Sequence, residues 1–172
     1  MSTYIASISV VPSDTINIPQ PGVLDSGTST AGAGAGEIED TGADWTNATT
    51  NDASPAGYNI SGGDVVYNIT DSTIAQITSV QNATTLDIST NTFQGATDAY
   101  EIYKGNVGGT KGYSFYVGTS TGATDTIKVL DINGNTTTLV GIAANTIYDL
   151  QIVRVYSTGT SGVSDIVALE QA

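Results

Sequence analysis

The chain contains no cysteine and no histidine among its 172 residues. Their absence excludes disulfide bonds, thiolate nucleophiles and zinc sites with cysteine or histidine ligands. It also excludes catalytic triads and acid–base mechanisms that depend on an imidazole. Charged residues make up only 12% of the chain, about half the proportion of an average globular protein. We therefore expect no enzymatic activity, no cofactor and no metal.

Basic residues are especially scarce. The chain has four, Lys104, Lys111, Lys128 and Arg154, whereas residues 1–103 contain twelve acidic residues and no basic one. The net charge is −13. Proteins that bind nucleic acid neutralise its phosphates with clustered lysine and arginine, so we expect no nucleic-acid partner. We also expect no membrane partner, because no apolar run approaches the roughly 18 residues of a membrane span.

Polarity comes instead from threonine, serine, asparagine and glycine, which suit strands and tight turns more than long helices. No stretch of ten or more residues has a convincing helical period, although residues 92–99 could hold one helical turn. Apolar side chains alternate in short runs separated by turn residues. The predicted strands are two within residues 3–19 and then 65–69, 73–80, 84–89, 99–103, 113–117, 124–132, 135–142, 146–156 and 165–169.

This pattern predicts an all-β fold of antiparallel sandwich or barrel units, jelly-roll-like or small barrels, with little or no helix. Asn133-Gly134 is the strongest hairpin signal, because both residues tolerate positive φ. The strand at residues 146–156 has apolar groups on both faces, which predicts a central position. The only tryptophan, Trp45, is expected to fill a small core.

Composition divides the chain into three predicted parts. Residues 1–36 would be an N-terminal arm of two strands followed by a flexible loop ending in alternating alanine and glycine. Residues 37–104 would form a small acidic β unit, with residues 37–62 rich in loops. Residues 105–172 would form a C-terminal β-sandwich unit, and the glycine-rich run from residue 105 to 111 would link the two units.

Several segments, in order, resemble tailed-phage structural proteins. The first group is DTGADW at residues 40–45, GDVVYNITD at 63–71, ITSV at 77–80, TTLDIS at 84–89 and AYEIY at 99–103. The second group is YVGT at residues 116–119, VRV at 153–155, TGT at 158–160 and SDIVAL at 164–169. The second group is similar to phage and gene-transfer-agent head proteins of the decoration or spike-base type.

The resemblance implies a β-rich virion protein without enzymatic activity, made in the host cytoplasm and bound to the capsid surface. Its expected partners are the major capsid protein and copies of itself, as a trimer or pentamer, because capsid axes impose such symmetry. The apolar N-terminal arm is the expected contact with neighbours. The predicted interface residues are Tyr4, Ile5, Ile8, Val10, Ile16 and Ile18.

Two alternatives remain open from the sequence. A tail-fibre or adhesin module could stack host-surface glycans on tyrosine rings. The candidate rings are Tyr58, Tyr67, Tyr100, Tyr103, Tyr113 and Tyr116. A calcium-dependent surface-layer or matrix protein is the second alternative. Asp131–Asn135 has alternating oxygen ligands, but Thr136 and Ile142 occupy the positions where a calcium loop requires glycine and glutamate. A hairpin turn is therefore the favoured interpretation of that segment.

Overall fold

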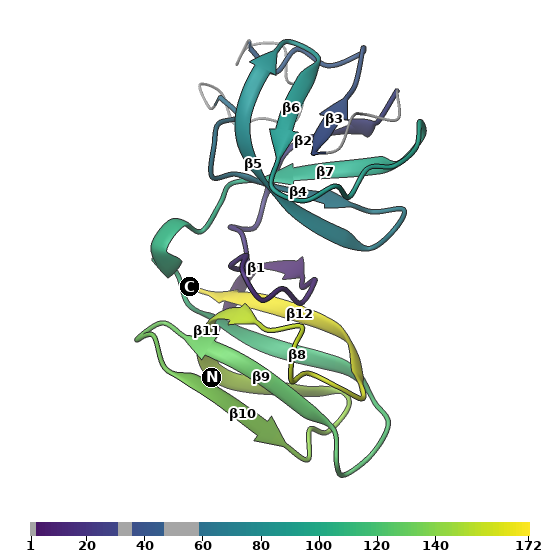
Figure 1. Cartoon of the computed structure of the whole chain (residues 1–172). Coiled ribbons are helices and arrows are strands. Elements are labelled where there is room, and N and C mark those ends of the chain that lie inside the picture. Colours follow the sequence, from purple (N-terminus) through teal and green to yellow (C-terminus); the bar gives the residue numbers. More distant parts are fainter. Residues whose placement is uncertain (1–2, 31–35, 47–58) are drawn as a thin grey trace. The chain divides into compact units, whose positions relative to one another are not determined.

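The computed structural model describes residues 3–30, 36–46 and 59–172, and nearly all of its regular structure is antiparallel strand (Figure 1). This confirms the all-β prediction, and neither of the two sheets closes into a barrel. The strands are β1 (Tyr4–Ser9), β2 (Val23–Thr28), β3 (Glu37–Glu39), β4 (Val65–Asn68), β5 (Thr73–Asn82), β6 (Thr85–Ile88), β7 (Ala99–Tyr103), β8 (Tyr113–Ser120), β9 (Thr126–Asp131), β10 (Thr136–Val140), β11 (Thr146–Val155) and β12 (Val163–Gln171). A 3₁₀ turn, η1, spans Val107–Gly109.

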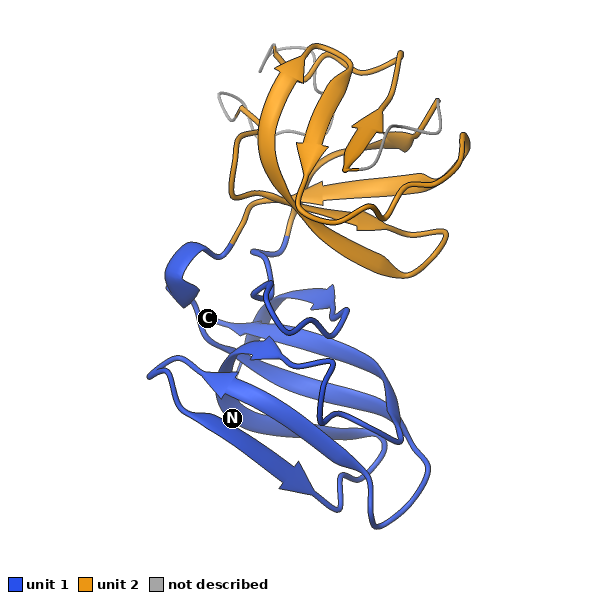
Figure 2. Cartoon of the chain, in the orientation of Figure 1, with its two compact units in different colours: residues 1–21, 106–172 blue, residues 22–105 orange. Residues whose placement is uncertain are grey.

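The chain forms two compact units (Figure 2). Unit 1 combines residues 1–21 with residues 106–172, and unit 2 comprises residues 22–105. This division differs from the three parts expected from composition, because β1 is not a separate arm. It pairs in antiparallel fashion with β12, so that Ile8 lies opposite Ala168. The N-terminal strand is thereby built into the C-terminal unit.

Unit 1 is one bent sheet with the strand order β1-β12-β8-β11-β9-β10. Strand β11 pairs with β8 along its first part, where Thr146 lies opposite Val117. It pairs with β9 along its last part, where Val155 lies opposite Val129. Both ladders shift register at Ile152. A strand that changes partner in this way allows the sheet to bend, so that its apolar face can pack against itself. Strand β11 is also central in the sheet, as predicted.

The core of unit 1 follows from strand alternation. Phe115, Val117, Ile127 and Val129 are fully buried on one side of β8 and β9, as the period of two requires. The second strand expected within residues 3–19 does not form. Prolines at positions 12 and 19 flank that segment, and proline cannot donate to a ladder.

Unit 2 also contains a strand that changes partner, and its strand order is β2-β7-β4-β5-β6-β3. Strand β5 pairs with β4 from Thr73 to Gln76 and with β6 from Ile77 onward. Trp45 lies in the core of this unit with 1% of its surface exposed, which confirms its predicted role. The core comprises Leu24, Ile38, Trp45, Ile60, Val66, Ala75, Ile77, Leu86, Ile88, Phe93, Tyr100 and Ile102.

The hairpin of β9 and β10 is confirmed, but its turn differs from the expected one. Only Gly134 has a positive φ, of 87°, so Asn133 does not adopt the left-handed conformation. The backbone N–H of Gly134 donates to the carbonyl of Asp131, and the N–H of Asp131 donates to the carbonyl of Asn135. This matches a type I turn followed by a glycine bulge. Residues 92–99 contain no helical turn.

Candidate interaction surface

The six residues predicted as an interface do not form one exposed patch. Ile8, Val10 and Ile18 are buried within unit 1. Tyr4 and Ile16 are half-buried, and Ile5 is 63% exposed. Alternation along β1 explains the split, because its even-numbered residues face the core that β12 and β8 complete.

A different set of residues lies on the solvent side of the unit 1 sheet. Tyr116 alternates with the buried Phe115 and Val117 and therefore faces away from the core. In register with it, Val167 lies opposite on β12 and Ile147 opposite on β11. Ile147 is 47% exposed, and the other two are half-buried. We call Val167, Tyr116 and Ile147 the outer row.

Polar contacts hold the surroundings of the outer row in place. The Tyr116 hydroxyl donates to Oδ1 of Asn145 at 2.9 Å. Two residues along β8 and on the same face, the buried Ser114 donates to Oδ1 of Asp149 at 2.7 Å, and Nε2 of Gln171 donates to Ser114 at 2.8 Å. Three adjacent strands thus present a fixed surface with an apolar centre and no basic side chain in the outer row.

Beyond β11, two of the four basic residues gather around one aromatic ring. Nζ of Lys128 lies 4.9 Å from the centroid of Tyr156, and Cζ of Arg154 lies 5.6 Å from it. Both distances are within the range of a cation–π interaction. Arg154 also donates from Nε to Oδ1 of Asn17 and from Nη1 to the carbonyl of Asp14, each at 2.9 Å. The guanidinium therefore fastens residues 14–17 to the edge of β11.

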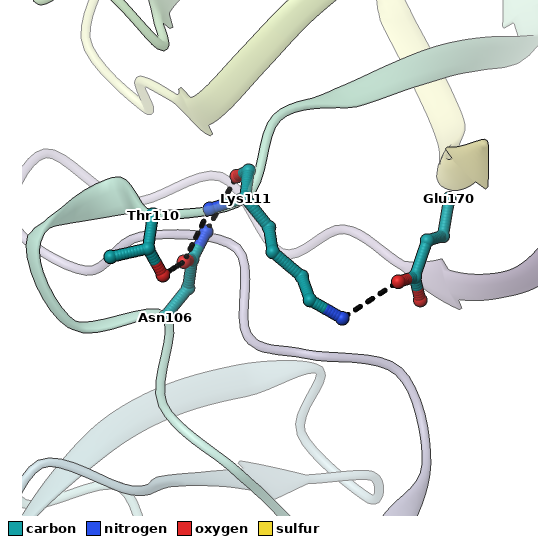
Figure 3. Close-up of polar contacts among 4 residues, drawn as sticks. All are labelled: Asn106, Thr110, Lys111 and Glu170. Carbon is teal, nitrogen blue, oxygen red and sulfur yellow. Dashed lines mark hydrogen bonds and ion pairs between the residues drawn. The ribbon is translucent and has the colours of Figure 1, made fainter. Parts of the chain in front are cut away.

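The segment linking the units has its own fixed geometry, drawn in Figure 3. The buried Asn106 donates from Nδ2 to the carbonyl of Lys111 at 2.9 Å, and its Oδ1 accepts from the Lys111 N–H and the Thr110 hydroxyl. Nζ of Lys111 forms an ion pair with Glu170 at 2.7 Å. The lysine is 44% exposed, so the pair contributes at most about 1 kcal/mol. Side-chain contacts therefore hold the glycine-rich run in a defined conformation.

Aspartates anchor the loops of unit 1. The carboxylate of Asp125 accepts from the backbone N–H groups of Thr121 and Gly122 and from the hydroxyl of Ser120. These donors, with the Gly122 N–H first, lower the pKa of Asp125 below its usual value. Asp131 likewise accepts from the N–H groups of Asn133 and Asn135, and the Asn135 contacts lower its pKa. Asp131 thus serves as an acceptor within the hairpin turn.

In unit 2, a buried aspartate accepts a hydrogen bond from an aromatic side chain. The Tyr100 hydroxyl donates to Oδ2 of the buried Asp40 at 2.7 Å. Burial, reinforced by this hydrogen bond, raises the pKa of Tyr100. The ring of Trp45 contacts Tyr100 edge to face at a centroid distance of 6.0 Å. These contacts orient rings within a core, which is a structural role.

The tyrosines proposed for glycan stacking are mostly inside the protein. Tyr67, Tyr100, Tyr103 and Tyr113 are buried, and Tyr116 is half-buried. Tyr58 lies outside the described residues. Four of the six rings therefore cannot stack on a sugar in this structure.

Within residues 3–30, 36–46 and 59–172, no group of three or more acidic side chains is placed to hold a metal ion. Among the same residues, no helix is long and apolar enough to cross a membrane. Comparisons with protein-family models, curated proteins and solved structures find no match for this chain.

Proposed function

We propose that the protein is a non-enzymatic virion structural protein that decorates a capsid and stabilises it. The observation that carries the proposal is the outer row, three uncharged side chains in register on adjacent strands of a chain with a net charge of −13. A cement protein needs a surface of this kind, because it acts by burying area against neighbouring proteins and performs no chemistry. The ordered sequence resemblance to phage head proteins directs the proposal to a capsid.

The charge distribution supports unit 1 as the attachment unit. Residues 22–105 contain eleven acidic residues and one lysine, a net charge of −10, whereas residues 1–21 and 106–172 together carry −3. Charged residues are depleted from the centres of protein interfaces. A strongly acidic unit 2 is suited to remain in solvent, where it keeps free copies soluble and apart. In this proposal the major capsid protein contacts the outer row.

The proposal is tested by mixing the purified protein with purified expanded capsids and measuring bound protein by sedimentation. Ile147→Asp places a charge in the outer row beside Tyr116, at a position exposed enough to leave the core intact. Thr90→Asp places the same charge on an exposed position of unit 2 and is the matched control. We expect saturable binding by the wild type and the control, and at least about tenfold weaker binding by Ile147→Asp.

Two results would contradict the proposal. One is the absence of saturable binding by the wild-type protein to any capsid encoded beside its gene. The other is equal binding by Ile147→Asp and Thr90→Asp, which would show that the outer row is not the contact. A coding position next to a major capsid protein gene would identify which capsid to use.

A further inference from the structure

The two sheets have four edge strands, which differ in how they are protected. An edge strand presents unpaired N–H and C=O groups, and proteins blunt such edges with bulges, charges, proline or short length. In unit 1, the register of β1 breaks between Tyr4 and Ala6. In unit 2, the register of β2 breaks between Val23 and Asp25, and the strand carries a carboxylate. Both edges are therefore interrupted.

The other two edge strands, β3 and β10, differ in whether they carry protective features. Strand β3 has three residues, of which Glu37 and Glu39 are charged. Strand β10, with the sequence TTTLV, has five residues, no charge, no proline and no break in its ladder with β9. Four of its residues are exposed, including Val140 at 69%. Among the four edges in the described part of the chain, β10 is the one without protection.

The hydrogen bonds beyond the ends of β10 fix the direction of its backbone groups. Asp131 donates to the carbonyl of Asn135, and Gly141 donates to the carbonyl of Asp125, each at 2.9 Å. In an antiparallel ladder, hydrogen-bonded pairs alternate with non-bonded pairs. Odd-numbered residues of β10 therefore bond to β9. The N–H and C=O groups of Thr136, Thr138 and Val140 point away from the sheet.

We propose that β10 is a self-association site, at which β10 of a second copy adds in antiparallel register. Centring the pair on Thr138 places that residue opposite its own copy and Thr136 opposite Val140 of the other chain. The three outward-facing residues of each strand would then exchange six backbone hydrogen bonds. All three side chains are β-branched, the class that packs best across a ladder. The strand is therefore complementary to itself.

Electrostatics permit this pairing. The nearest cation in the ladder is Lys128, which lies opposite Thr138 within one copy. Across the dimer, the two Lys128 positions are separated by three strand spacings, about 14 Å. That distance exceeds the screening length of about 8 Å at physiological salt. Since no charged side chain lies on β10 itself, like charges do not meet at the contact.

The inference goes beyond the proposed function, because strand pairing between copies requires no capsid. A single pair of short strands buries little area, so the dimer is expected to be weak in solution. It would strengthen where copies are held side by side, because the second contact becomes intramolecular. Lateral pairing of this kind would join neighbouring copies on a surface.

The first test is sedimentation equilibrium of the full chain from micromolar to millimolar concentration. We expect the average mass to rise from the monomer value of 17.5 kDa towards twice that value. Thr138→Pro removes an N–H that faces away from β9, a place where an edge strand tolerates proline. We expect it to raise the dissociation constant at least about tenfold. Circular dichroism checks that the fold is kept, and Thr138→Lys replaces it if it is not.

The second test examines the register. Thr138→Lys and Thr138→Glu each place like charges opposite one another across the twofold axis and should abolish association. Mixing the two variants should restore it as a heterodimer. Thr124→Lys, at an exposed loop position of the same unit, should dimerise as the wild type does. A monomeric wild type at every concentration, undiminished association of Thr138→Lys, or no heterodimer on mixing would each overturn the proposal.

Discussion

The indole Nε1 of Trp45 donates a hydrogen bond of 2.7 Å to Oδ2 of Asp25. This contact ties the residues that follow β3 to β2, at the opposite edge of the unit 2 sheet. The indole is almost fully buried, and the carboxylate lies at the boundary of the core. The bond therefore holds together two parts of unit 2 that share no strand ladder.

Trp45→Phe should destabilise unit 2 by about 1 to 3 kcal/mol, because it removes the donor and leaves the Asp25 carboxylate short of one partner. Asp25→Asn keeps an acceptor for the indole and should cost less. Denaturant titration followed by circular dichroism measures both. Equal stability of Trp45→Phe and the wild type would contradict this account of the bond.

A second prediction separates the two cores. Phe115 in unit 1 and Phe93 in unit 2 are both fully buried, and truncation of either to alanine should cost about 3 to 5 kcal/mol. The only tryptophan, Trp45, lies in unit 2, so fluorescence reports the unfolding of that unit. Phe93→Ala should lower the midpoint of the fluorescence transition. Phe115→Ala should lower the circular-dichroism midpoint with less effect on fluorescence.

The sequence predicted strands where alternation was strong and missed those where it was weak. Tyr113, Phe115 and Val117 alternate clearly and lie in β8. Strand β3 has one apolar residue, Ile38, between two glutamates. It forms because Ile38 pairs opposite Leu86 of β6, a tertiary contact that local propensity does not contain. For the same reason no strand is predicted over β2, which has the sequence VLDSGT.

The outer row could not be predicted from alternation alone, because it also depends on the register between neighbouring strands. The sequence indicates that Tyr116 and Ile147 lie on strands, but not that they are direct neighbours on one face. Likewise, the apolar pattern of β1 suited both an arm for a partner and a strand of the protein's own sheet. Its partner β12 lies at the other end of the chain, and pairing over such a separation leaves no local signal.

Substitution of the buried Tyr113 is expected to maintain or increase stability, in contrast to the core substitutions above. Its hydroxyl is buried and has no hydrogen-bond partner among the residues that the structure describes. Burial raises the pKa of this tyrosine. Tyr113→Phe should leave stability unchanged or raise it by about 1 kcal/mol, because it removes an unpaired polar group from the core. A clear loss of stability on thermal denaturation would indicate that the hydroxyl has a partner.

The loop anchors of unit 1 should make its stability depend on pH. The pKa of Asp125 is lower in the folded state because N–H and hydroxyl groups donate to its carboxylate. Its contribution is therefore complete above the usual aspartate pKa of about 3.9 and is lost as pH falls through the folded value. Asp125→Asn should be less stable than the wild type at pH 7, and this difference should shrink below about pH 4. Thermal denaturation at pH 7 and at several pH values below about 4 measures this difference.

Alanine substitutions at two glycines separate the free-energy cost of a strained backbone from that of a steric clash. Gly134 and Gly162 both have positive φ, of 87° and 74°. A Cβ at Gly134 would meet nothing within 4 Å, whereas a Cβ at Gly162 would overlap the carboxylate of Asp125. Gly134→Ala should therefore cost only the left-handed penalty of about 1 to 2 kcal/mol. Gly162→Ala should cost clearly more, because it also displaces the side chain that fastens Thr121 and Gly122.

The comparison contains its own control. In the background of Asp125→Ala the clash at position 162 is relieved, and the two glycine substitutions should then cost about the same, since only the shared φ penalty remains. Denaturant titration of the four variants and the Asp125→Ala parent provides the required free energies of unfolding. If Gly162→Ala still cost more than Gly134→Ala in that background, the excess would have to arise from the backbone of the loop and not from the aspartate that it encloses.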